Sequence, residues 1–199
     1  MKKFLLITFV SLAFAGLATA AITPAIVGTP TVDGADFQWN YQISVDNQEE
    51  LVAASSTPCA TAAACGSFFT IYDFEGYVAG SITAPTGWST QVSLVGLTNS
   101  TQSPTDSATV DNLTFIYTGT PSPDPGPISN LTGFSALSTF GQVNTGGTFT
   151  YQADKLDGLV DAGNGSINVP LSSTPEPATT GLIALGLAGI ALARRKFAR

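Results

Sequence analysis

The segment from Asp36 to Asp46 has the clearest pattern of apolar and polar positions in the chain. The two kinds of residue alternate at every position, so one face of an extended segment carries Phe37, Trp39, Tyr41, Ile43 and Val45. The opposite face carries only carboxylate, amide and hydroxyl side chains. A period of two residues is typical of a strand with one buried face. We therefore predict a half-buried antiparallel strand here.

Weaker patterns predict further strands at 67–74, 77–83, 88–94, 108–117, 148–153 and 166–171. Turn-forming Gly, Pro, Asn and Asp residues separate them, and the only candidate helical turn lies near 48–55. Short strands with such turn signals indicate an all-β fold for residues 21–174, an antiparallel β-sandwich or jelly roll. Within it, Pro121–Pro127 cannot join a sheet ladder, because proline has no N–H to donate, and we predict a stiff surface loop rather than a hinge.

The first 20 residues have the order of a secretory signal peptide. Lys2 and Lys3 precede the apolar run 4–17, and the small residues Ala18 and Ala20 suit cleavage by signal peptidase after Ala20. A transmembrane anchor is the alternative, but the run is shorter than the roughly 20 residues that a spanning helix needs. We predict that residues 1–20 are removed during export.

Three consecutive parts also make up residues 175–199. Pro175, Glu176 and Pro177 precede the uncharged run 178–193, which ends at the basic cluster Arg194, Arg195 and Lys196. As a helix the run would be roughly 24 Å long, so it spans a bilayer only if its basic end snorkels or the bilayer thins. The positive-inside rule holds the basic cluster in the cytoplasm and leaves the body outside.

This tail, with its Pro-Glu-Pro, Gly-rich apolar helix and basic stop, resembles the PEP-CTERM sorting signal of Gram-negative bacteria. The resemblance implies recognition by an exosortase, a membrane-embedded transpeptidase-like enzyme, and processing near the Pro-Glu-Pro. It also implies a membrane-anchored precursor that is then released or attached at the surface, and an association with exopolysaccharide and biofilm. Some collections label the same tail by its occurrence on ice-binding proteins.

Charge separates the body from these two signals. Six of the seven cationic residues lie in the terminal segments; between residues 21 and 174 the only cation is Lys155, against thirteen Asp and Glu residues. A body without a basic footprint does not bind nucleic acid. The chain also lacks histidine, which excludes Ser-His and Cys-His nucleophile pairs and His-ligated zinc. We expect an exported, non-catalytic surface or extracellular-matrix protein with no cofactor.

The two cysteines, Cys59 and Cys65, are six positions apart in an exported chain, so we predict a disulfide that closes a small loop. The alternative is a pair of reduced or metal-binding thiols. Two cysteines without histidine cannot complete a zinc site, and a redox motif would have two intervening residues instead of five.

Asp73 and Glu75 are the best candidates for enzymatic chemistry. Two residues apart on a predicted strand, they would share one face about 7 Å apart, within the range of paired carboxylates that hydrolyse glycosides. The alternative function is therefore a secreted glycan-acting hydrolase. Jelly-roll glucanases carry a third carboxylate in a longer pattern, and this chain lacks it, so a solvated strand end is favoured.

Two further features concern ligands of the body. Oxygen-rich segments at 154–165 and 33–36 could bind structural calcium, although neither has the ligand spacing of an EF-hand, and Asp-Gly turns explain both. Among the aromatic residues, Trp39 and Tyr41 lie on the apolar strand face and are predicted in the core. Trp88 follows a turn and is the better candidate for an exposed ring that stacks on a glycan.

Overall fold

A computed structural model describes residues 22–120 and 127–172 of the chain. The predicted signal peptide (1–20), nearly all of the Pro121–Pro127 segment and the predicted sorting tail (175–199) lie outside the described residues. Within the described part, no helix is both long and apolar enough to cross a membrane.

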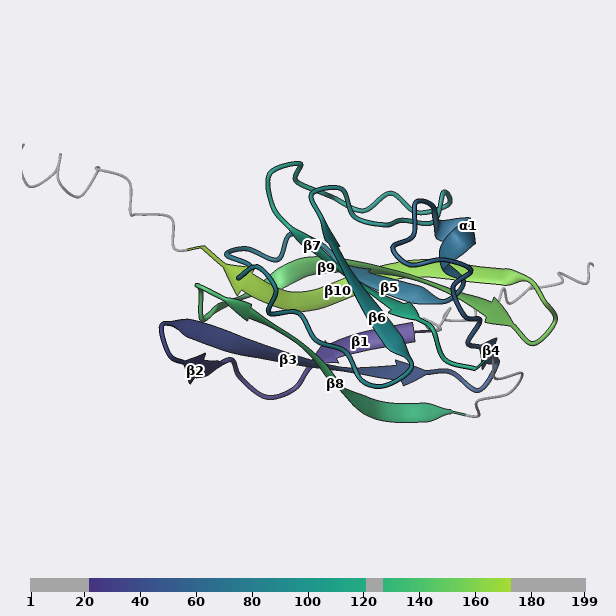
Figure 1. Ribbon diagram of the computed structural model, residues 1–199, viewed down its shortest axis with the longest axis horizontal. Coiled ribbons are helices and arrows are strands. Elements are labelled where there is room, and N and C mark those ends of the chain that lie inside the picture. The colour runs from purple at the N-terminus through teal and green to yellow at the C-terminus, as the bar shows by residue number, and fades with distance from the viewer. Residues whose placement is uncertain (1–21, 121–126, 173–199) are drawn as a thin grey trace, which may run out of the picture.

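The described residues form two antiparallel sheets and one four-residue helix, α1 (Ala62–Cys65) (Figure 1). The first sheet contains β1 (Ile22–Ile26), β2 (Thr31–Asp33), β3 (Asp36–Val45) and β8 (Ile128–Ser138). The second has the order β10-β9-β5-β7-β6, with β4 also paired to β9; its strands are β4 (Glu49–Glu50), β5 (Phe68–Ile71), β6 (Trp88–Ser93), β7 (Asn112–Tyr117), β9 (Gln142–Lys155) and β10 (Val160–Leu171). The prediction of an all-β, antiparallel fold is confirmed.

Strand β3 organises the first sheet, as its alternating pattern predicts. One edge pairs with β1 and then β2, and the other edge pairs with β8. The side chains of Trp39, Tyr41, Ile43 and Val45 are buried, whereas Phe37 is half-buried. Because polar residues occupy the other face, β3 buries one side against the second sheet and leaves the other accessible.

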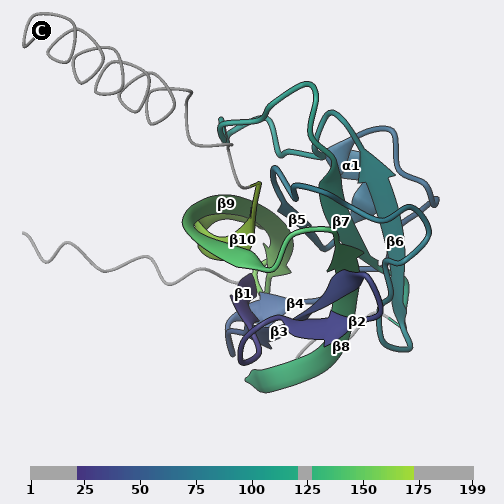
Figure 2. The same ribbon diagram turned by 90° about the vertical axis from the view of Figure 1, so that its left-hand side faces the viewer.

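The two sheets share one aromatic-rich core. Phe69 of β5, Phe115 of β7 and Phe134 of β8 lie with their ring centroids 4.8–5.3 Å apart, which joins the sheets. The Tyr41 hydroxyl donates to the Asn168 carbonyl of β10 at 3.0 Å, a second link between the sheets. In Figure 2, β9 and β10 curve strongly, with β1, β2, β3 and β8 below them.

The second sheet is covered on its outer face as well. Phe68 and Ile116 point away from the main core and pack with Leu97 and the two cysteines in a smaller apolar cluster. Figures 1 and 2 show α1 and its loops on this side of the sheet. Strands β5 and β7 therefore lack a solvent face, which explains why their sequences show little alternation.

Two expectations about secondary structure are wrong, and the long strand β8 was not predicted. The segment 77–83 forms no strand and makes only isolated bridges to β8, because Gly80, with φ +78°, lies within a turn. The candidate helical turn near 48–55 is instead the short strand β4 and a loop. Strand β8 was not expected, because its first half is mostly exposed and shows no apolar alternation.

Candidate functional site

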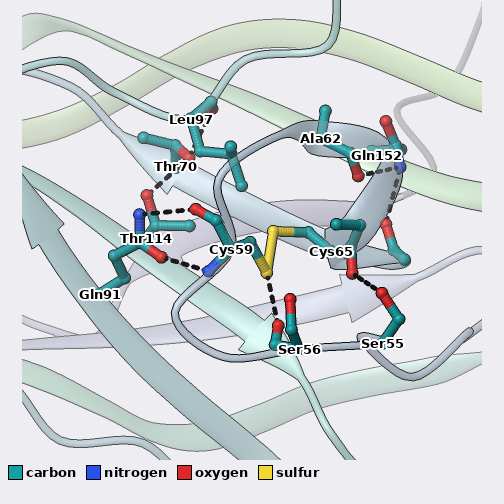
Figure 3. Close-up of a disulfide and its surroundings, with 12 residues drawn as sticks. Ser55, Ser56, Cys59, Ala62, Cys65, Thr70, Gln91, Leu97, Thr114 and Gln152 are labelled. Atoms are coloured by element: carbon teal, nitrogen blue, oxygen red, sulfur yellow. Dashed lines mark hydrogen bonds between the residues drawn. A yellow bond between two sulfur atoms is a disulfide. The ribbon is translucent and has the colours of Figure 1, made fainter.

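The predicted disulfide between Cys59 and Cys65 is present, with their Cα atoms 5.5 Å apart. Two glutamines fasten the disulfide loop to the second sheet (Figure 3). The Gln91 amide accepts from the Cys59 N–H at 2.9 Å and donates to the Cys59 carbonyl at 3.3 Å. The Gln152 amide donates to the carbonyls of Ala62 at 3.1 Å and Gly66 at 2.8 Å. The loop is thus held at both ends by strand side chains.

A second loop, residues 94–106, is held against the same sheet by hydroxyl groups. The Leu97 carbonyl accepts from Thr70 Oγ1 at 2.8 Å and from the Tyr72 hydroxyl at 2.9 Å, and Tyr72 also bonds Thr98. At Gly96 a Cβ atom would lie 2.2 Å from the Tyr72 ring, so only glycine permits this approach. Asn99 then donates to Gln152 at 2.6 Å, which joins the two loops.

Between these loops and the start of β10 lies an open groove of about 1320 Å³. Its neutral polar side chains include Gln91, Ser93, Asn99, Thr101, Gln102 and Gln152. Three carboxylates, Asp106, Asp154 and Asp161, also line it. The described residues that line the groove include no lysine, arginine or aromatic ring. The groove therefore presents amide and hydroxyl groups together with negatively charged carboxylates.

Apolar side chains stand at the groove as well. Val95 is 73% exposed and Val160 57% exposed, although both are large apolar residues. Burial, and after it the charge of Glu50, raise the pKa of the nearby Asp154 carboxyl. The sequence shows no signal for this groove, because its residues come from three separate segments, 52–66, 91–106 and 152–162.

A buried carboxylate lies beside the groove. Glu49 of β4 is only 3% exposed, and its Oε2 atom has no hydrogen-bond partner among the described residues. Burial first, and then the carboxylate of Asp161, raise the pKa of Glu49 to about 7. Lys155, whose Nζ lies 3.8 Å from Asp161 Oδ1, acts in the opposite direction and lowers the pKa of Glu49.

The expected placement of Asp73 and Glu75 on one strand face is wrong, because β5 already ends at Ile71. Asp73 has φ +53° and accepts from the Ser107 N–H at 2.8 Å. Glu75 accepts from the Ser172 N–H at 3.0 Å. Each carboxylate is thus bonded to the backbone of a different segment, and neither residue lines the groove.

The expectation of an exposed Trp88 is also wrong. The side chain is 9% exposed, and its ring lies edge-on to three aromatic rings, with centroid distances of 5.2 Å to Phe134, 5.4 Å to Tyr117 and 5.9 Å to Phe69. A ring enclosed in this way has no free face on which a glycan could stack. Trp39 and Tyr41 lie in the core, as predicted.

The two segments considered for calcium form turns. Asp33 and Asp36 are paired across the β2–β3 hairpin, and Asp157 accepts from the Leu159 N–H at 3.1 Å in the β9–β10 turn. Within residues 22–120 and 127–172, no group of three or more His, Cys, Asp and Glu side chains is placed to hold a metal ion.

Comparison with known proteins places the tail in a family. The PEP-CTERM protein-sorting motif matches residues 173–196. The chain contains a PEP-CTERM sorting domain at its C-terminal end. No curated protein and no solved structure matches the chain.

The match covers all three parts of the PEP-CTERM signal: Pro175, Glu176 and Pro177, the apolar run, and Arg194, Arg195 and Lys196. The motif indicates an exported protein, made as a membrane-anchored precursor that an exosortase processes. It begins at residue 173, directly after Ser172, so the PEP-CTERM signal starts where the described body ends.

Proposed function

We propose that the processed body is a non-catalytic component of the cell surface or extracellular matrix that associates with exopolysaccharide. The sorting motif at residues 173–196 is the observation that carries this proposal. Before processing, the apolar run anchors the precursor in the inner membrane. The β-sandwich is the part that is delivered, and its thirteen carboxylates and single cation keep neighbouring copies apart.

The groove supports an uncharged polysaccharide as the ligand. Amide and hydroxyl groups can both donate to and accept from sugar hydroxyls, and internal hydrogen bonds hold Asn99 and Gln102 in place. Three carboxylates line the groove and none of its described lining residues is cationic, which disfavours an anionic polymer. The exposed side chains of Val95 and Val160 offer apolar contact to the C–H faces of a sugar.

The position of the groove along β10 supports this use. Val160 lines the groove at the first residue of the strand, and the sorting signal follows two residues after the last, Leu171. The strand has 12 residues, or roughly 38 Å along its path at about 3.3 Å per residue. In Figure 1 the end of β10 lies on the left and α1 on the right. A polymer in the groove would thus bind far from the membrane-anchored end.

A retention assay on immobilised exopolysaccharide tests this proposal. Ala63 is an exposed lining residue of α1, so Ala63→Trp fills the groove without removing a side-chain hydrogen bond. Val32 is 73% exposed on β2, away from the groove, and Val32→Trp is the matched control. We expect Ala63→Trp to lose at least about tenfold in affinity, or 1.4 kcal/mol, and the control to bind normally. Equal retention of both variants would contradict the groove as the binding site.

A further inference from the structure

Glu75 lies where the last strand of the body leaves the domain. Its Oε2 atom accepts a hydrogen bond from the backbone N–H of Ser172, at 3.0 Å. Ser172 directly follows β10, whose last residue Leu171 is paired with Gln142 of β9. The sorting motif begins at the next position. This carboxylate therefore holds the chain at the junction between the body and the sorting signal.

The turn that carries Glu75 is itself fixed to the end of β8. Ser138 Oγ donates to the Glu75 carbonyl at 2.6 Å, and the Thr139 N–H donates to the Gly76 carbonyl at 2.9 Å. Gly76 has φ +65°, and a Cβ there would lie 2.4 Å from Thr139 Oγ1. Because both the backbone and its neighbours restrict this turn, Glu75 is a rigid anchor for Ser172.

The anchor limits how far the processing region can move from the body. Pro175 is three residues beyond Ser172, so it reaches at most about 10 Å from that anchor. Without the hydrogen bond, the exposed Leu171 and the half-buried Ser172 can detach, which adds two residues, or about 7 Å, of free chain. Detachment stops at Pro170, which is buried, as is Val169 directly before it.

We propose that Glu75 is a positioning residue for exosortase processing: it holds the Pro-Glu-Pro segment close to the folded body and so slows access of the membrane-embedded enzyme. A folded domain within about 10 Å of the processed segment obstructs an enzyme that must surround that segment. Glu75 lies outside the matched motif, so the sequence that the enzyme recognises is unchanged by its substitution. The proposal rests on the sorting motif and is independent of any ligand in the groove.

The test uses the full-length precursor in the bacterium that produces it. Pulse-labelling gives the half-life of the precursor, and hydrogen exchange of the purified precursor gives the opening of the Ser172 amide. A hydrogen bond to a charged group is strong enough that Glu75→Ala should raise Ser172 exchange about tenfold or more. We expect the precursor half-life to shorten at least about twofold as detached junctions become more populated. Glu75→Gln keeps an acceptor oxygen and should lie between Glu75→Ala and the unmodified protein.

Asp73→Ala is the matched control, because it removes a carboxylate and a 2.8 Å hydrogen bond from the same turn without touching β10. We expect this variant to keep the normal half-life. Unchanged Ser172 exchange in Glu75→Ala, or faster exchange with an unchanged or longer half-life, would overturn the proposal. An equal shortening in Asp73→Ala would also overturn it, because the cause would then be a general loosening of the turn. If Glu75→Ala does not fold, Glu75→Gln supplies the same comparison. Failure of Ala63→Trp to weaken polysaccharide binding would leave this proposal intact.

Discussion

Glu49 should make the stability of the body depend on pH in a direction opposite to that of an ion-paired carboxylate. The side chain is 3% exposed, one of its oxygens has no hydrogen-bond partner among the described residues, and its pKa rises from 4.5 to about 7. Between these two values the folded protein keeps the proton, whereas the unfolded chain releases it. Protonated Glu49 therefore contributes its full stabilisation of the folded state below about pH 4.5, and this contribution is lost as the pH rises through 7.

The size of the effect follows from the two pKa values. A rise from 4.5 to about 7 corresponds to a loss of about 3 kcal/mol of folding stability at alkaline pH. Glu49→Gln keeps the shape of the side chain but never ionises. We therefore expect the variant to be about 3 kcal/mol more stable than the unmodified protein at pH 8 and equal to it near pH 4.

Urea unfolding of the mature protein at pH 4, 5.5, 7 and 8 measures this difference. Trp39 and Trp88 are the only tryptophans and both are buried, so their fluorescence reports unfolding directly. Glu50→Gln removes one charge from the same strand at a less buried position, and the fall in stability that Glu49 causes between pH 4.5 and 7 should remain in this variant. A Glu49→Gln variant whose stability falls between pH 4.5 and 7 as steeply as that of the unmodified protein would refute the reasoning.

Two further substitutions test the loops that form the groove. Replacing Cys65 by Ser opens the disulfide loop and should lower the unfolding free energy by about 2 kcal/mol in urea titrations; unchanged stability under oxidising conditions would count against a structural disulfide. Gly96→Ala places a methyl group against the Tyr72 ring and should lower the unfolding free energy by about 1–3 kcal/mol. Gly146→Ala is the matched control, because Gly146 is exposed, also lacks a positive φ, and an added Cβ there would approach only the Asn144 side chain, at 3.3 Å. Equal losses for the two glycine variants would show that the contact with Tyr72 is unimportant.

Elements with a regular apolar pattern could be predicted from the sequence. Strand β3 was predictable because its buried side chains alternate over ten residues. Strand β8 was not, because Asn130 and Gly133 adopt positive φ values and interrupt any alternation. The register of β8 comes from its pairing with β3, which lies about 90 residues earlier in the chain. Such long-range pairing leaves no local signal.

The candidate sites show the same division between local and long-range information. The sorting signal could be identified because its three parts are consecutive, and the disulfide because its cysteines are six positions apart. The environment of Trp88 depends on Phe134, which lies 46 positions away, so its burial could not be read locally. The proposed positioning role of Glu75 depends on its hydrogen bond with Ser172, which lies 97 positions away, so no local pattern indicates it.

The mass of the mature protein in the cell-surface and medium fractions tests the central claim most directly. Cleavage by signal peptidase predicts a protein that begins at Ala21, and processing by an exosortase predicts that it lacks the apolar run and Arg194, Arg195 and Lys196. Substituting Glu176 should leave the precursor in the membrane fraction. If the protein recovered from the surface has a mass that shows residues 175–199 are still attached, the claim is contradicted.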